Sequence, residues 1–189
     1  TTYLHGDTSS MDLRQVIDKR MKERGLVCND IRSREPQWDE KNIKNIKLKI
    51  EKYYASDADE YHISMDDDSI NKSYGFCRLR LTKEYTIGVL TKYALIRELH
   101  VYGPVVKVNN HNDKSSQHVG FGRLMLKKAE EIAMSNGYKK IAVISGVGVR
   151  DYYRKFGYEH ENDFNYMIKN LDYTLYKLEQ IQNWLLIIL

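Results

Sequence analysis

The segment 117–122, with the sequence QHVGFG, has the residue types and spacing that suit the binding of an anion. Its form is Q-x-x-G-x-G, and apolar residues at helical spacing follow it as far as Asn136. Two such glycines let backbone N–H groups approach a ligand closely, and the amides and dipole of a helix N-terminus favour a pyrophosphate. An ordinary tight turn has the same pattern. The segment lacks both the third glycine of G-x-G-x-x-G and a following Lys-Ser/Thr pair, which argues against a dinucleotide site and a P-loop.

The segments around this turn alternate between strand and helix patterns, which predicts an α/β fold. FCRLRL at 76–81 alternates with period two, as a half-buried strand does, and KIAVIS at 140–145 is typical of a central strand covered on both faces. The other expected elements are strands at 85–90 and 94–102, helices at 11–25, 120–136 and 147–156, an extended piece at 26–35, a strand or short helix at 40–54, two strand-like pieces within 158–169, and a helix over 172–189.

The composition fits one folded domain and excludes several classes of protein. The chain has 189 residues, 42% of them hydrophobic and 30% charged, which is enough for a buried core and excludes general disorder. Cys28 and Cys77 are the two cysteines and lie far apart in sequence, which argues against a disulfide scaffold, a zinc ribbon and an iron–sulfur cluster. The apolar run 184–189 is shorter than the roughly 20 residues that span a bilayer. With no secretory signal at the start, we expect an intracellular protein, cytoplasmic or nuclear, without a membrane partner.

The net charge of +4 is distributed unevenly along the chain. Residues 53–70 contain six acidic and no basic side chains, and they separate two parts with net charges of +3 and +7. The favoured interpretation of this acidic insert is a solvated loop. A calcium site is rejected because the insert has neither the glycine nor the distal glutamate of an EF-hand loop.

Longer strings in the sequence resemble a known family. Q-x-x-G-x-G between a strand and an amphipathic helix resembles the acyl-CoA signature of the GNAT acetyltransferase superfamily. IRELHVYG at 96–103, AVISGVGVR at 142–150 and DYYRKFGY at 151–158 resemble the acetyltransferase domain of the Elongator catalytic subunit, and CNDIRSRE at 28–35 resembles that family's linking segment. The resemblance implies a GNAT fold, with a mixed central sheet flanked by helices. It divides the chain into a linker-like segment 1–36, an acetyltransferase domain 37–170 and an extra helical tail 171–189.

The resemblance also implies a site for acetyl-CoA. The strand with Glu98–Val101 would hold the acetyl carbonyl and the pantetheine through its backbone, where a bulge leaves N–H groups unpaired. The start of the following helix would hold the pyrophosphate, with Arg123 adding positive charge. The expected cofactor contacts are Glu98, Leu99, His100, Val101, Gln117, Val119, Gly120, Phe121, Gly122, Arg123, Leu124 and Tyr153.

Three side chains are candidates for catalysis. Tyr153 is placed by the resemblance where a phenol protonates the departing thiolate. Its neighbour Tyr152 points about 100° away on a helix, so both cannot face the sulfur, and aromatic packing is the alternative role for both. Glu98 and His100 share one face of a strand, and either would accept a proton from an amine. An ion pair with Arg97 or a neighbour is the alternative role for them.

One part of the resembled family is missing from this sequence. That family carries a radical S-adenosylmethionine domain with a CxxxCxxC motif, and two cysteines cannot supply it, so no iron–sulfur cluster is expected here. We therefore expect an acetyl-CoA-dependent N-acetyltransferase linked to wobble-uridine modification of tRNA. The alternatives are a protein lysine acetyltransferase of the histone or tubulin type and a catalytically silent acetyl-CoA-binding module. The apolar tail would cap a neighbouring domain or mediate self-association.

Overall fold

The computed structural model describes residues 13–36, 45–82, 90, 92–102, 120–161, 165–174 and 176–178. The chain divides into two compact units, Thr1–Glu35 and Pro36–Leu189. In the first unit, the expected helix is α1 (Leu13–Glu23), which ends before Gly25 at a φ of 67°. The extended piece expected after it is instead a turn at 31–34. The backbone N–H of Arg32 donates to Asp30 Oδ1 at 3.0 Å there, so local side-chain bonding outweighs the strand pattern.

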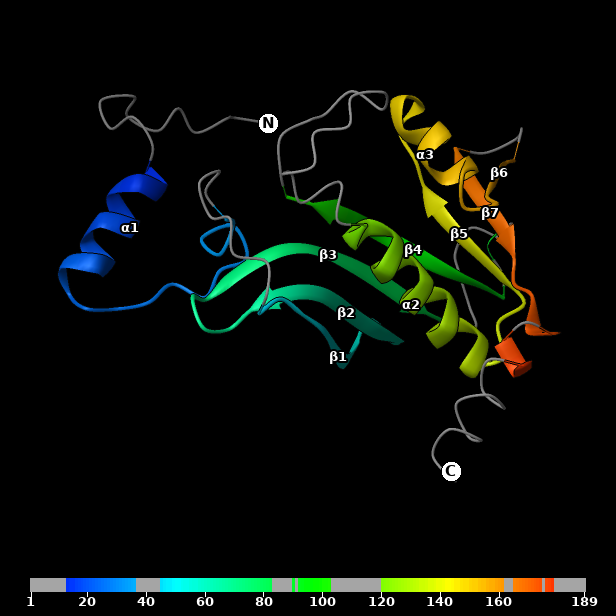
Figure 1. The fold of residues 1–189 in the computed structure, drawn as a ribbon, viewed down its shortest axis with the longest axis horizontal. Coiled ribbons are helices and arrows are strands. Elements are labelled where there is room, and N and C mark those ends of the chain that lie inside the picture. Colours follow the sequence, from blue (N-terminus) through cyan, green and yellow to red (C-terminus); the bar gives the residue numbers. More distant parts are fainter. Residues whose placement is uncertain are drawn as a thin grey trace. The chain divides into compact units, whose positions relative to one another are not determined.

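The second unit is built on a seven-stranded sheet in the order β1-β2-β3-β4-β5-β7-β6 (Figure 1). The first four strands pair antiparallel with their neighbours, and β4 pairs in parallel with β5. This mixed sheet confirms the α/β fold that the sequence predicts. The strands are β1 (Lys47–Ala55), β2 (Ala58–Asp67), β3 (Lys72–Leu81), β4 (Tyr93–Val101), β5 (Lys140–Ile144), β6 (Glu159–His160) and β7 (Tyr166–Asn170).

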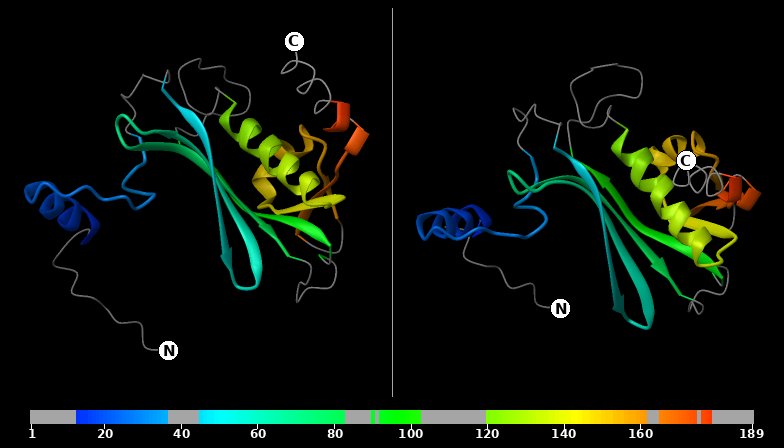
Figure 2. Two further views of the ribbon diagram at one scale, coloured as in Figure 1. Left: turned by 90° about the horizontal axis from the view of Figure 1, so that it is seen from below. Right: turned by 60° about the horizontal axis from the view of Figure 1, so that its bottom comes forward.

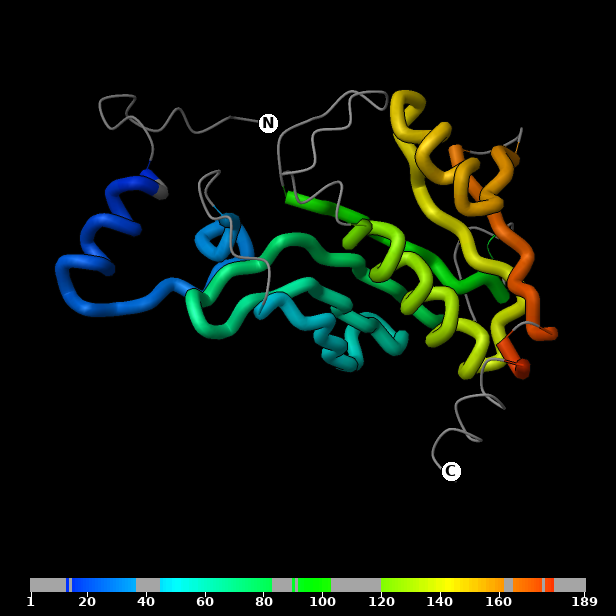
Figure 3. The backbone as a smooth tube through the Cα atoms, in the orientation of Figure 1, coloured from blue at the N-terminus to red at the C-terminus, as the bar shows by residue number. Residues whose placement is uncertain are grey.

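Helix α2 (Phe121–Ser135) connects β4 to β5 and lies along one face of the sheet (Figure 2). A 3₁₀ turn, η3 (Val147–Val149), leads directly into α3 (Arg150–Arg154), as the path of the backbone shows in Figure 3. The helix expected at 147–156 is therefore shorter than its pattern suggested, because its first three residues form a 3₁₀ turn.

The main core lies between the sheet and α2. Its buried members include Ile96 of β4, Met125 of α2 and Tyr153 of α3. Residues that alternate with these point to the opposite side, which we call the far face and define by Leu95, Arg97, Glu98 and His100 of β4 and the β3 residues paired with them. A smaller apolar cluster on that side contains Leu90, Leu95, Ala142 and Ile168.

The acidic insert at 53–70 is not the solvated loop that the sequence predicted. Most of it forms the hairpin of β1 and β2, and the side chains of Glu60, Asp66 and Asp67 are buried. Arg80 and Arg97, both distant in sequence, compensate the charge of Glu60, so a local count of acids was misleading.

Two expected elements fall wholly or partly outside the described residues. Of the expected strand at 85–90 only Leu90 is described, and most of the expected helix 172–189 also lies outside. Within the part of the chain that the structure covers, no helix is long and apolar enough to cross a membrane.

Candidate active site

Strands β4 and β5 separate along their length, and this separation defines the candidate site. Their parallel pairing runs from Tyr93–Lys140 to Ile96–Val143 and ends there, and Figure 1 shows the two strands diverging beyond it. On the other side of β4, Arg78 pairs with Glu98 and the next pair is Leu79–Ile96. Arg97 is therefore an extra residue on β4, a β-bulge at the point where the strands part.

The bulge directs backbone amides of β4 into this opening. The N–H of Tyr102 donates to the carbonyl of Tyr74 on β3 at 3.0 Å. Because N–H groups alternate between the two sides of a strand, those of Leu99 and Val101 point away from β3, toward the side that β5 has left. The bulge expected in this strand from the sequence is present.

The start of α2 meets the end of β4. Gly120 precedes the helix at a φ of 79°, a conformation that suits glycine, and the Leu124 N–H donates to its carbonyl at 3.0 Å. No side chain among the described residues caps this end, so its first amides have no partner within the helix. A Cβ on Gly122 would be 3.4 Å from Val101 Cγ2 and would overlap the Tyr152 hydroxyl. Gln117 and Val119 of the predicted site lie outside the described residues.

The two adjacent tyrosines of α3 have different surroundings. Tyr152 places its hydroxyl beside Gly122, whereas Tyr153 is 5% exposed and packs its ring 5.8 Å from that of Tyr158. Burial raises the pKa of Tyr152 to about 12, with a smaller contribution from nearby Cys77. Burial and the same neighbour raise the pKa of Tyr153 even further. Both phenols therefore stay protonated at neutral pH and have the state that a proton donor needs.

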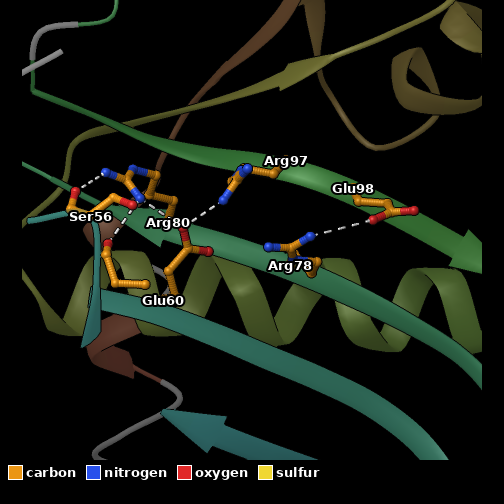
Figure 4. A network of polar contacts seen from close by, with 7 residues as sticks. Ser56, Glu60, Arg78, Arg80, Arg97 and Glu98 are labelled. Carbon is orange, nitrogen blue, oxygen red and sulfur yellow. Dashed lines mark hydrogen bonds and ion pairs between the residues drawn. The ribbon is translucent and has the colours of Figure 1, made fainter. Parts of the chain in front are cut away.

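Glu98 and His100 lie on the far face, away from α2. Figure 4 shows Glu98 beside Arg78, and their charged atoms are 4.0 Å apart with both side chains partly exposed. The His100 ring lies 4.7 Å from that of Tyr102 and 5.9 Å from that of Phe76. The two candidate bases and the buried tyrosines thus approach the opening of the strands from opposite faces of the sheet.

The structure adds apolar residues that the sequence patterns did not assign to the site. Ile144 ends β5 where β4 has diverged, and Val147 and Val149 follow it with exposed side chains, that of Val147 at 78%. Leu124, which the sequence did assign, is also exposed, on the first turn of α2. The sequence patterns around Ile144, Val147 and Val149 predicted that these side chains are buried. Their exposure in the structure is the feature that suggests contact with a ligand.

Polar groups at the site do not resemble a metal centre. Among the described residues, no group of three or more His, Cys, Asp or Glu side chains is arranged to hold a metal ion. Cys77 is buried on β3, opposite Leu99, and burial raises the pKa of its thiol to about 12.

Comparisons with known proteins agree with this geometry. Elongator complex protein 3 from Bos taurus is 39% identical over 168 residues, and the protein of that name from Saccharomyces cerevisiae is 39% identical over 169 residues. These alignments cover 85% and 83% of this chain, and the chain spans about 30% of the length of each relative.

A solved structure of an archaeal protein of this name is also similar to this chain. Archaeal Elp3 from Methanocaldococcus infernus, with its N-terminus deleted, is 37% identical and aligns with a TM-score of 0.69 over 83% of this chain and 38% of its own. No protein-family model matches the sequence. The chain is a homologue of one region of Elongator complex protein 3, and it shares the fold of the corresponding region of the archaeal protein.

Proposed function

We propose that this region binds acetyl-CoA and uses its acetyl group in an acyl-transfer reaction. The observation that carries the proposal is the end of the β4–β5 pairing at Ile96–Val143, next to the bulge at Arg97. This opening lies between amides that can bind a carbonyl and a helix start that can bind phosphate.

The residues present fit acetyl-CoA. We assign the pantetheine to the amides of Leu99 and Val101, which lie on the side of β4 that does not pair with β3, like the amides of a strand edge. The pyrophosphate is assigned to the uncapped first turn of α2 at Gly120–Leu124, with the Arg123 guanidinium as an additional cation. The exposed apolar side chains of Ile144 and Val147 would cover aliphatic parts of the ligand. Gln117 and Val119 stay in the proposed site through the sequence motif alone.

Tyr153 is our candidate for the proton donor. When bound, acetyl-CoA supplies an activated acyl group on a thiol leaving group. The Tyr152 hydroxyl lies against Gly122, at the end of the site that we assign to phosphate. Tyr153 lies deeper, in the core beneath the sheet, and its protonated hydroxyl is the group that would donate to a departing sulfur.

Glu98 and His100 are the candidates for proton acceptors on the far face. Both lie within three residues of the bulge at Arg97, and the exposed His100 ring is reachable from solvent. A base on this face would take a proton from an acceptor that approaches from the side opposite to α2.

For the acceptor, we propose tRNA, as an extension of the homology to Elongator complex protein 3. The relatives are about three times as long as the aligned region, so the acetyl-CoA half of a wobble-uridine modification is the part assigned to this chain. A protein lysine is the alternative acceptor.

Acetyl-CoA turnover should be measured with the full chain alone, with tRNA, and with histone-tail or tubulin peptides. We expect thioester cleavage that rises when tRNA is added. If a peptide becomes acetylated and tRNA does not increase thioester cleavage, the acceptor is a protein and not tRNA. Absence of acetyl-CoA binding in calorimetry would reject the proposed function.

A pair of glycine variants tests the placement of the phosphate site. Gly120 and Gly137 flank the two ends of α2 at φ values of 79° and 84°, and neither has an atom within 4 Å of an added Cβ. Gly120→Asp should abolish acetyl-CoA binding because it puts a carboxylate at the phosphate site, whereas Gly137→Asp should retain it. Equal losses in the two variants would reject the placement.

A further inference from the structure

A buried carboxylate on the far face is connected directly to the bulge of β4. Glu60 of β2 is 1% exposed, and its Oε1 accepts hydrogen bonds from Arg80 and from Arg97, each at 2.8 Å. Figure 4 shows the two guanidinium groups meeting at this one carboxylate. Within the described structure, the second oxygen, Oε2, is buried without a hydrogen-bond partner.

This arrangement crosses three strands. Glu60 is directly opposite Arg80 in the β2–β3 register, and Arg80 is opposite Leu95 in the β3–β4 register. Arg80 also donates to the carbonyls of Ala55 at 3.2 Å and Ser56 at 2.5 Å, which fixes one end of the network at the turn between β1 and β2. The other end is Arg97, so Glu60 links a firmly held arginine to the bulge.

The register of β3 and β4 leaves the bulge residue without an opposite residue on β3. Arg97 is this residue, since the pairs on either side are Arg78–Glu98 and Leu79–Ile96. The extra residue of a bulge is unpaired and locally disrupts the ladder, so a side-chain contact can help to hold it. The Arg97 side chain is 43% exposed, and its ion pair with Glu60 connects it to β2.

Burying a carboxylate is costly unless charged partners offset the cost. Two guanidinium groups offset the cost here, but hydrophobic residues of similar volume would often be as stable. The network also fixes the relative positions of the groups that it joins. What it positions is the bulge, and with it the direction of the Leu99 and Val101 amides.

We propose that Glu60 is a positioning residue for acyl-CoA binding: through Arg97 it fixes the β4 bulge and aims the following amides into the opening between β4 and β5. This inference rests on the proposed function for the identity of the ligand. It concerns a residue on the face opposite to α2 that does not itself reach the opening.

The test compares Glu60→Gln with Glu130→Gln in the full chain. Glu130 is a matched control because it is also a largely buried carboxylate with two donors, the Tyr158 hydroxyl at 2.9 Å and Lys169 Nζ at 2.8 Å, but it is remote from the bulge. Calorimetry with CoA should show about tenfold weaker binding for Glu60→Gln, the size of a one-interaction coupling, and wild-type affinity for Glu130→Gln. Affinity within twofold of wild type in Glu60→Gln would overturn the proposal.

A double-mutant cycle separates positioning from general destabilisation. Arg97→Gln changes the more exposed partner and should weaken CoA binding to the same degree, and the double variant should lose nothing further. Additive losses would show that the two residues act independently, and the proposal would fail. This variant also provides the measurement if Glu60→Gln does not fold.

Hydrogen exchange without ligand gives a readout that does not depend on acetyl-CoA. Glu60→Gln should speed exchange in 98–102, whose alternate amides pair with β3, and should leave 93–96 unchanged. Unchanged exchange in 98–102 would overturn the positioning role. If wild type binds no CoA but the exchange result holds, the proposed ligand fails and the control of the bulge by Glu60 stands.

Discussion

The Tyr152 hydroxyl lies beside Gly122, in the space that a Cβ on that residue would occupy. The contact joins α3 to the first turn of α2, next to Val101 at the end of β4. Glycine at this position therefore permits three elements to meet where we place the phosphates of the ligand.

Gly122→Ala should destabilise the fold and weaken acetyl-CoA binding, because the methyl group must displace the packed Tyr152 ring. Overpacking of this kind costs about 1–3 kcal/mol in free energy of unfolding. Gly148→Ala is the matched control: nothing lies within 4 Å of its Cβ, and we expect a change within about 0.5 kcal/mol. Adding Tyr152→Phe to Gly122→Ala removes the overlapping oxygen and should restore most of the stability in urea unfolding. No recovery would show that the clash is not with the hydroxyl.

The two tyrosines should respond differently to loss of a hydroxyl group. If Tyr153 is the proton donor, Tyr153→Phe should lower kcat by about 10²- to 10⁴-fold with little change in the Kd for acetyl-CoA. Tyr152→Phe should change kcat much less, since that hydroxyl lies at Gly122. Single-turnover rates together with calorimetry would separate the effects. A larger loss of kcat in Tyr152→Phe than in Tyr153→Phe would identify Tyr152 as the proton donor.

The sequence predicts helices and strands best where their apolar residues all lie on one face, which is buried in the core. The alternation in β3 and the helical spacing in α2 identify both elements, because the apolar residues of each contact a single core. The pattern in 140–145 likewise identifies β5.

Features that depend on distant partners were not predictable from local patterns. Glu60 was counted within an acidic insert, yet Arg80 and Arg97 lie 20 and 37 positions away and neutralise it. The position of the bulge depends on the register of β3 and β4, which a single strand does not encode. The exposed apolar residues after β5 have the same composition as buried ones, so only the structure distinguishes them.

The glycine of β3 is expected to be less tolerant of substitution than Gly122. A Cβ on Gly75 would lie 2.7 Å from the His100 carbonyl oxygen and 3.2 Å from Val101 Cα, both of them backbone atoms. Gly75→Ala must therefore separate β3 from β4 at the end of β4, and we expect a loss of about 3 kcal/mol or more in free energy of unfolding. Gly146→Ala, with nothing within 4 Å, serves as the control in thermal unfolding. Equal melting temperatures for the two variants would contradict this close approach of the strands.

The thiol of Cys77 should make stability depend on pH in the alkaline range. Burial raises its pKa from an ordinary value of 9.0 to about 12. Between these values the unfolded chain has lost the thiol proton and the native protein retains it, so the unfolded state binds fewer protons. The free energy of unfolding therefore falls by up to about 1.4 kcal/mol per pH unit above pH 9, and the contribution is fully present below pH 9.

Urea unfolding of wild type and Cys77→Ala between pH 8 and pH 10, under reducing conditions, measures this contribution. The variant should be less stable at pH 8, because removing the buried sulfur leaves a cavity on the core side of β3. Its stability should nevertheless decline less steeply with pH than that of wild type. Titrating groups that do not interact with Cys77 are common to both proteins and cancel in the difference. Parallel slopes would mean that the thiol ionises as easily in the folded protein as in the unfolded chain, which its complete burial opposite Leu99 does not allow.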